Sequence, residues 1–339
     1  MSSVEFAQGL ESELPAIAAL LHNTFGTNDT YRVFRPEVMR WKCHAPHPLW
    51  NGSRSYVVRY QGEVAGCGCM VPMELLTPAG DVLRAGVVID WAGSRAVPGS
   101  GALIYRGLQD LVDVLMGIGG SDDARAIIPR MGFKVRSSIE NSVRVTRPVT
   151  HMFHSRPLTW KSPLRAGRDS LQLIKPSTSV PQSWSAKPVQ RFDASVNPVL
   201  PVPRAGIVAR RTPELLNYYL DCPASAMRGF LLSLDQRLQG YFILSRVGRE
   251  TRIAELWITS AEEADWRAAY ALAARLASKE DGTTEISARA ALPVERSAVA
   301  AAGFRVIASD PVFVKDPKKK LPADIALGVG AMANDAFYL

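Results

Sequence analysis

A glycine-rich turn follows an apolar run in Ile89-Asp90-Trp91-Ala92-Gly93-Ser94-Arg95-Ala96-Val97-Pro98-Gly99-Ser100-Gly101-Ala102-Leu103. The residues before the turn have the pattern of a strand, and those after it have the pattern of a helix. Glycines at such a junction let backbone N–H groups and the positive end of a helix dipole face a pyrophosphate. The same pattern also occurs in ordinary strand-to-helix connections, so the turn indicates a function only together with other motifs.

Hydrophobic periodicity predicts the elements around this turn. A helix is predicted over 14–25, because its apolar residues recur at helical spacing and Gly26 follows as a stop. The next helix should run from Gly101 to the glycines at 117–120, since the apolar period continues through Leu115. Between the two helices, apolar runs separated by turn residues predict strands at 55–60, 64–75 and 82–92.

Short motifs recur in the same order in the two halves of the chain. Three pairs were found, with offsets of 177, 174 and 171 residues: 36–39 with 213–216, 61–66 with 235–240, and 131–133 with 302–304. One match of this kind could arise by chance, whereas three in register favour a duplicated unit. Each copy would then supply its own mixed sheet and flanking helices.

These motifs resemble those of the GNAT (Gcn5-related N-acyltransferase) family. The family loop has the form Gln/Arg-x-x-Gly-x-Gly/Ala, and residues 96–101 stand in its place. A later short helix that ends in Gly-Phe is matched by Ser121 through Gly132-Phe133. The first half, with Trp41-Lys42 on a helix before the hairpin, is similar to tandem GNAT proteins associated with cell-envelope polysaccharide biosynthesis.

The resemblance implies an α/β (α+β) fold of two tandem GNAT-like units, each a mixed, mostly antiparallel sheet flanked by helices. An N-terminal unit with the acyl-CoA loop would span 1–145, and a degenerate C-terminal unit would span 205–339. The Pro-rich segment 146–204 is expected to be an extended inter-domain passage. Because 257–266 contains no glycine, the second unit is expected to act as a scaffold or as a wall of the acceptor cleft.

The co-substrate implied by the resemblance is acetyl-CoA or another acyl-CoA. Two departures from the family loop weaken the expectation: Ala96 replaces the usual Arg or Gln, and Pro98 has no N–H to donate. Ile128 also stands where many members have a tyrosine that protonates the departing thiolate. The residues carried over as cofactor-binding are Trp91, Ala92, Val97, Gly99, Ser100, Gly101, Ala102 and Ser121.

Asp90 and His44 are the candidate catalytic residues. Asp90 is an acid in an otherwise apolar strand beside the loop, where burial is unfavourable without a role. It would act as the base or position the acceptor, although a surface-facing residue at a strand end would look the same. His44 lies in a segment that borders the acceptor side in the family, and a solvated loop histidine is the alternative.

The charge and the residue composition bear on which ligands, metals and locations are expected. A formal charge of +8 and a pI near 9.4 suit an anionic ligand or surface, and equally a soluble protein with no such partner. The four cysteines are scattered and His151 and His154 have no third ligand nearby, so no disulfide framework and no metal site is expected. A cytoplasmic location follows as the simplest expectation. The sequence predicts no membrane span, and a peripheral membrane contact is compatible with it.

The leading functional hypothesis is therefore an N-acyltransferase that acts on a primary amine of an amino sugar or other small metabolite. One alternative is a Fem-type transferase that takes its acyl group from aminoacyl-tRNA; otherwise no specific nucleic acid is expected. Another alternative is a catalytically silent tandem GNAT module that binds a nucleotide or a polysaccharide precursor. The oligomeric state, the acceptor and the acyl length do not follow from the sequence.

Overall fold

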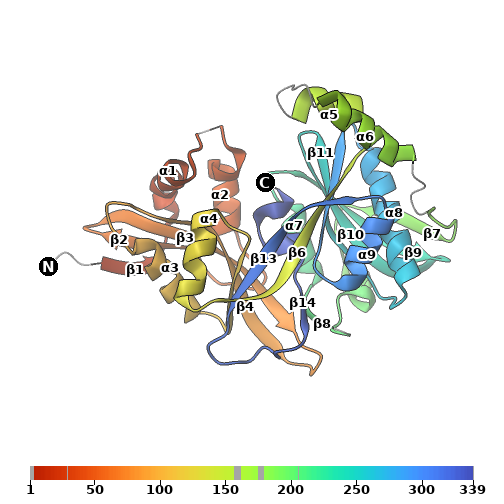
Figure 1. Cartoon of the computed structure of the whole chain (residues 1–339). Coiled ribbons are helices and arrows are strands. Elements are labelled where there is room, and N and C mark those ends of the chain that lie inside the picture. Colours follow the sequence, from red (N-terminus) through yellow and green to blue (C-terminus); the bar gives the residue numbers. More distant parts are fainter. Residues whose placement is uncertain (1–3, 29, 156–161, 175–178, 205, 339) are drawn as a thin grey trace.

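The computed structural model describes residues 4–28, 30–155, 162–174, 179–204 and 206–338. The first half of the chain (Figure 1) contains β1 (Val4–Gln8), α1 (Leu14–Phe25), α2 (Pro36–Cys43), β2 (Ser55–Tyr60), β3 (Glu63–Leu76), β4 (Val82–Gly93), α3 (Ser100–Gln109), β5 (Val114–Ile118), α4 (Asp122–Ile127) and β6 (Lys134–Val145). The middle contains α5 (Pro148–Ser155), α6 (Ser162–Ile174), β7 (Trp184–Val189) and β8 (Gly206–Ala209). The second half contains α7 (Pro213–Leu220), β9 (Ala226–Leu234), β10 (Arg237–Val247), β11 (Glu250–Ile258), α8 (Glu263–Ser278), β12 (Glu285–Ala290), α9 (Pro293–Ala301), β13 (Arg305–Lys315) and β14 (Ala326–Gly328).

The same order of elements occurs twice. β2-β3-β4-α3-β5-α4-β6 in the first half corresponds to β9-β10-β11-α8-β12-α9-β13 in the second. In both halves, antiparallel hairpins lead to a long strand, which pairs in parallel with the strand after the next helix: β4 with β5, and β11 with β12.

The strands of the described residues form one sheet, and at its centre strands of the two halves pair with each other. Its order is β1-β2-β3-β4-β5-β13-β6-β12-β11-β10-β9-β7, with β8 joining β3 to β14. β13 of the second half lies between β5 and β6 of the first, and β6 pairs with β12. The last strand of each half therefore pairs with a strand of the other half. The predicted mixed α/β fold with a mostly antiparallel sheet and flanking helices is confirmed.

The hydrophobic core also runs through both halves. One continuous cluster contains residues of α1, β3 and β4 together with residues of α7, β10 and the C-terminal segment 331–338. Figure 1 shows this segment between the two halves, close to α2 and β11. Among the described residues, no helix is long and apolar enough to cross a membrane.

The predicted helix over 14–25 is confirmed with its boundaries. It starts with Pro15 in its first turn and ends at Gly26, which takes the left-handed conformation at φ +63°. The strands predicted at 55–60, 64–75 and 82–92 are also present, to within one residue.

Two other predictions were wrong. The helix predicted from Gly101 to 117–120 ends at Gln109, and Val114–Ile118 is strand β5. This short apolar run is buried between β4 and β13, a setting in which periodicity cannot distinguish a strand from a helix. The segment 146–204 is not an extended passage, because it forms α5, α6 and β7.

Candidate functional site

The candidate site begins where β4 and β5 diverge. Their parallel pairing is confined to 85–87 of β4 and 114–116 of β5. Beyond Val87, β4 keeps β3 as its partner on one side, while β5 keeps β13 on the other. The facing edges of the two strands therefore carry backbone N–H and C=O groups with no sheet partner, and such edges can bind an extended ligand.

A β-bulge in β4 lies at this point. Between Cys67 and Cys69, one residue of β3 faces two residues of β4, Asp90 and Trp91. Asp90 has φ +50°, a left-handed conformation that aspartate tolerates better than most residues. Since a bulge bends its strand and redirects the side chains, the bulge accounts for the divergence of β4 from β5.

The N-terminus of α3 lies against the same stretch of β4. Gly99 takes φ +87° just before the helix and has open space where a side chain would stand. A Cβ on Gly93 would come within 2.7 Å of the Gly101 nitrogen, so the strand and the helix approach closely. The indole N–H of Trp91 donates to the Gly101 carbonyl at 2.8 Å. The first N–H groups of a helix have no intrahelical acceptor, and this end therefore favours an anion.

Asp90 forms a buried ion pair with Lys42 of α2. The two side chains are only 6% and 3% exposed, respectively. Burial opposes the charge of Lys42, but the combined effect of Asp90, Cys43 and Asp335 outweighs it and raises the pKa of Lys42. The ammonium also lies 5.2 Å from the centre of the Phe34 ring. The charge of Asp90 is thus balanced from within the protein.

A second carboxylate, Asp335, lines the same cleft as Asp90. Burial, followed by the negative charge of Asp90, raises the pKa of Asp335 to about 6. The positive charge of Lys42 partly opposes this rise. A carboxyl group with a pKa close to the working pH is well suited to proton transfer.

Arginines hold the chain on both sides of Asp335. Arg252 donates to the Ala336 carbonyl at 2.9 Å, and Arg32 donates to the Tyr338 carbonyl at 3.0 Å. Arg289 donates to the side-chain oxygen of Asn334 at 3.2 Å. The candidate base is therefore fixed by contacts from both halves of the chain.

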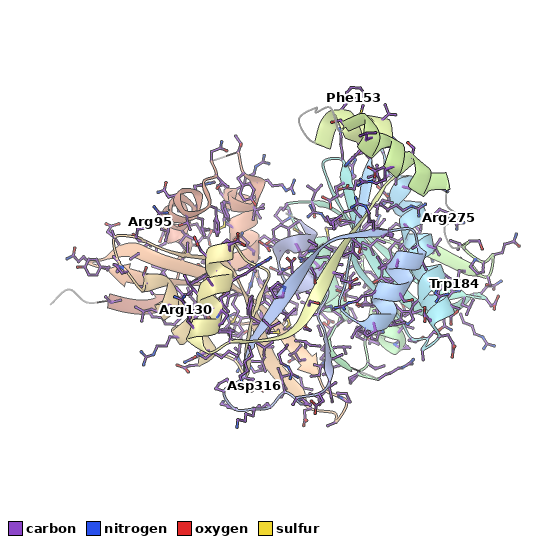
Figure 2. The ribbon with its side chains drawn as sticks, viewed as in Figure 1. Arg95, Arg130, Phe153, Trp184, Arg275 and Asp316 are labelled. Carbon is purple, nitrogen blue, oxygen red and sulfur yellow. The ribbon has the colours of Figure 1, made fainter. Side chains whose placement is uncertain are left out.

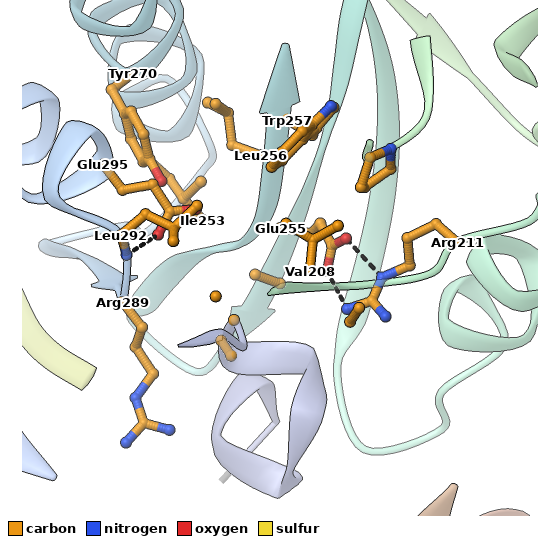
Figure 3. A pocket seen from close by; sticks show the side chains of 16 residues that line it. Val208, Arg211, Ile253, Glu255, Leu256, Trp257, Tyr270, Arg289, Leu292 and Glu295 are labelled. Carbon is orange, nitrogen blue, oxygen red and sulfur yellow. Dashed lines mark hydrogen bonds and ion pairs between the residues drawn. The ribbon is translucent and has the colours of Figure 1, made fainter. Parts of the chain in front are cut away.

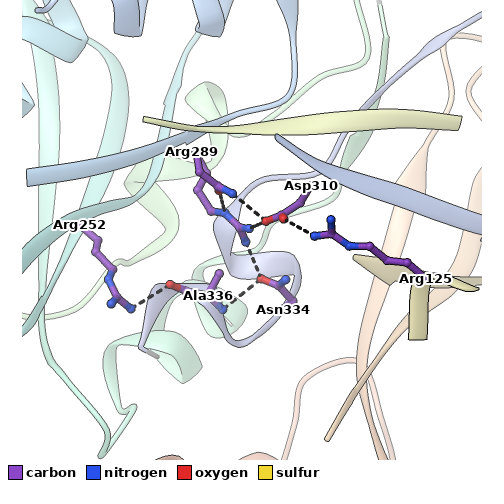
Figure 4. A network of polar contacts seen from close by, with 7 residues as sticks. Arg125, Arg252, Arg289, Asp310, Asn334 and Ala336 are labelled. Carbon is purple, nitrogen blue, oxygen red and sulfur yellow. Dashed lines mark hydrogen bonds and ion pairs between the residues drawn. The ribbon is translucent and has the colours of Figure 1, made fainter. Parts of the chain in front are cut away.

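A polar network forms the wall next to Asp335 (Figure 4). Asp310 of β13 accepts hydrogen bonds from Arg289, from Asn141 at 2.7 Å and from Arg125 at 3.3 Å. Burial lowers the pKa of Arg289, and the neighbouring Asp310 carboxylate partly offsets this. The wall combines side chains of α4, β6, β12 and β13, so it exists only because the two halves exchange strands.

One cleft with a volume of about 1290 Å³ is lined by Asp90, Asp335, Asp310, Arg289 and Arg125. Residues 88–96 of β4 and the following loop form one side, and residues 117–128 of β5 and α4 form another. Residues of α1 and of the segment up to Phe34 close the cleft on a third side, together with Asp310 and residues 334–336.

The predicted site residues fall into three places. Asp90, Trp91, Ala92 and Ser121 line the cleft. Residues 97–102, which include Val97, Gly99, Ser100, Gly101 and Ala102, form the turn and the start of α3 beside it. His44 follows α2 and is not among the residues that line the cleft. Burial lowers its pKa, so its ring is neutral near pH 7.

Sequence reasoning missed Lys42, Asp335 and Tyr105 as parts of the site. Lys42 was noted only as part of a family-like motif, and its partner Asp90 is 48 residues away in sequence. Asp335 is 245 residues away from Asp90 in sequence. Tyr105 lines the cleft from α3, and burial raises the pKa of its hydroxyl. A tyrosine in the helix after the loop was the available signal for it.

In the second half, the space where β11 and β12 diverge is nearly filled by side chains (Figure 3). Beyond the β11–β12 pairing only about 40 Å³ of space remains. Arg211 and Glu255 form a two-bond ion pair there at 2.6 and 2.9 Å, and Tyr241 donates to Glu255 at 3.0 Å. Glu295 accepts from two backbone N–H groups at the start of α9, while burial raises its pKa to about 7.

Solved structures with a similar fold cover most of the chain. A GCN5-related N-acetyltransferase from Anabaena variabilis has a TM-score of 0.60 and 10% identity, over 93% of this chain and 73% of that one. A putative acetyltransferase from Pyrococcus horikoshii has a TM-score of 0.56 and 12% identity, over 97% and 95%. Saccharomyces cerevisiae N-myristoyltransferase with bound myristoyl-CoA has a TM-score of 0.59 and 10% identity, over 93% and 83%.

No protein-family model and no curated protein matches the sequence. At identities this low, the structural likeness shows the fold alone. The chain has the GNAT fold that its loop and Gly-Phe motifs predicted.

Proposed function

We propose that the chain is an N-acyltransferase that moves an acyl group from a CoA thioester, with acetyl-CoA as the donor, to a primary amine. One observation carries the proposal. The cleft at the Asp90 bulge has the N-terminus of α3 beside it and the carboxylate of Asp335 within it. A site for phosphates would therefore lie next to the cavity that holds the candidate base.

The donor would bind along β4. The pyrophosphate would lie at Gly99–Ala102, where the helix dipole and the N–H groups of the first helical turn favour an anion. Arg95 lines the cleft beside this turn and would supply the positive charge that Ala96 cannot. The pantetheine arm would follow the unpaired edge of β4 at Trp91 and Ala92 and pass near Ser121.

The reaction would proceed by direct attack of the amine on the thioester carbonyl. Asp335 would take a proton from the ammonium, the amine nitrogen would bond to the carbonyl carbon, and the oxyanion would accept hydrogen bonds from backbone N–H groups near the bulge. The C–S bond would then break, and the second proton lost by the nitrogen would pass to the departing thiolate, which gives the amide and free CoA. Tyr105, whose raised pKa keeps it protonated, would donate a hydrogen bond to the departing sulfur.

In this proposal the two halves are tandem GNAT-like units with different tasks. The first binds the donor, whereas the second, whose own cleft is nearly filled, supplies the acceptor wall. This wall offers hydrogen-bond donors and acceptors, which come from Arg289, Asp310 and Asn334. Such a wall suits an acceptor with hydroxyl groups beside its amine, such as a cytoplasmic amino sugar used in polysaccharide synthesis.

Thiol release from acetyl-CoA in the presence of a panel of amino sugars and other small amines tests this function. We expect amine-dependent release by the native chain and about a hundredfold lower kcat for Asp335→Asn, the scale of losing a general base. Unchanged turnover in Asp335→Asn would remove its assigned role. CoA binding without turnover on any amine would favour the silent module, and absence of CoA binding would favour a donor carried on tRNA.

A further inference from the structure

The hairpin of α5 and α6 exposes large apolar side chains. Val149 and Phe153 of α5 are 63% and 58% exposed, and Leu164 of α6 is 67% exposed. Val149 and Phe153 are four residues apart, so they share one face of their helix. Figure 2 shows Phe153 at the outer edge of the hairpin, directed away from the sheet. A group of such residues on one protruding element marks a contact surface.

The hairpin is fixed to the body of the protein at its base. The backbone N–H groups of Thr146 and Arg147 both donate to the Thr284 carbonyl, at 2.8 and 3.3 Å. His151 lies 3.5 Å from the Glu285 carboxylate at the start of β12. These contacts leave the exposed apolar side chains free to meet a second surface.

The charge of this segment is predominantly positive. Residues 147–174 contain one acid, Asp169, which is buried and paired with Arg168, and five Arg or Lys residues. Among them, Arg147 and Arg168 are exposed. Exposed apolar residues next to an excess of basic ones are typical of helices that lie at an anionic membrane surface. A second copy of the chain would bring like charges together and is disfavoured as the occupant.

We propose that this hairpin docks the protein on an anionic lipid bilayer. Val149, Phe153 and Leu164 enter the boundary between headgroups and acyl chains, and the arginines contact lipid phosphates. The contact is peripheral and goes beyond the proposed acyl transfer, because none of these residues lines the cleft.

Co-sedimentation of the full chain with vesicles tests this docking. We expect binding to phosphatidylcholine vesicles that contain roughly one-third phosphatidylglycerol, weaker binding at high salt, and little binding to phosphatidylcholine alone. Phe153→Glu/Leu164→Glu should weaken binding at least tenfold. The matched control Leu10→Glu/Val202→Glu changes two apolar residues that are 59% and 45% exposed outside the hairpin, and it should bind like the native chain.

A second measurement does not depend on the stability of the charged variant. Phe153→Cys can be labelled selectively with an environment-sensitive dye, because the four native cysteines are buried. We expect a blue shift of the dye emission on addition of the anionic vesicles. The proposal is overturned if the native chain does not bind, if both double variants bind equally, if the dye emission is unchanged, or if the hairpin variant only abolishes self-association.

Discussion

Asp90 and Asp335 are two carboxylates in one cleft with different surroundings. Asp90 is paired with the buried ammonium of Lys42, whereas Asp335 has its pKa raised to about 6 by burial and by Asp90. Neighbouring acids in unlike environments commonly divide the roles of charge stabilisation and proton transfer. We therefore assign positioning to Asp90, through the bulge and Lys42, and proton removal to Asp335.

The raised pKa of Asp335 predicts a pH-dependent stability difference. Between pH 4 and about pH 6 the folded chain retains a proton on Asp335 that the unfolded chain loses, so this group makes folding less favourable as pH rises. Asp335→Asn cannot ionise and should be more stable than the native chain at pH 7, by about 1–3 kcal/mol. The difference should disappear near pH 4. Urea unfolding at the two pH values measures it, and equal stability at pH 7 would contradict the assignment.

The buried pair of Lys42 and Asp90 predicts that substitutions of these two residues have strongly coupled effects on stability. Lys42→Met should lower the free energy of unfolding by about 3–5 kcal/mol, because it leaves Asp90 buried without its partner. Asp90→Asn preserves shape and tolerates φ +50°. The double variant should consequently be more stable than Lys42→Met alone, as measured by urea unfolding. Additive losses would show that the two side chains do not depend on each other.

At the residue scale, the sequence indicated Asp90 because an acid in an apolar strand is unusual. It could not indicate that Lys42 neutralises this acid, since the pair depends on how α2 packs against β4. The position of Asp335 depends on arginines from both halves, which no local pattern records.

At the scale of elements, the bulge in β4 and the start of α3 work as one unit. Asp90 redirects the strand away from β5, and Gly93 lets α3 approach it closely. The glycine pattern predicted this strand-turn-helix unit from the sequence. The bulge was not predicted, because it is visible only in the register of β4 against β3.

Gly93→Ala tests how closely α3 must approach β4. The added Cβ would lie 2.7 Å from the Gly101 nitrogen, so the helix must shift. We expect a loss of about 1–3 kcal/mol in stability and at least tenfold weaker CoA binding. Gly167→Ala in α6 is the control, since its Cβ meets no atom within 4 Å; it should stabilise the chain slightly. Normal CoA affinity in Gly93→Ala would separate the start of α3 from the cofactor site.

At the scale of the whole molecule, the repeated motifs lie on elements that follow the same order in the two halves. They could not indicate the exchange of β6 and β13, because each copy read alone supplies a complete set of strands. The acceptor wall depends on that exchange, since Asp310 comes from β13 and Asn141 from β6. For this reason, the wall that contains Asp310 and Asn141 could not be predicted from the first half of the sequence alone.

The exchanged strands predict that both halves unfold together. β13 cannot leave β5 and β6 without opening the centre of the sheet. Urea unfolding followed by tryptophan fluorescence and by far-UV circular dichroism should give one coincident transition. Two separated transitions would mean that the halves are stable independently.

Calorimetric titration with CoA is the most direct test of the central claim that the cleft beside α3 is an acyl-CoA site. Gly99→Asp places a carboxylate at the helix N-terminus where the phosphates should lie, and Gly99→Asn adds the same bulk without the charge; both residues tolerate the left-handed backbone found there. We predict that the native chain and Gly99→Asn bind CoA and that Gly99→Asp binds it at least tenfold more weakly. Equal binding by all three, or no binding by the native chain, would contradict the account.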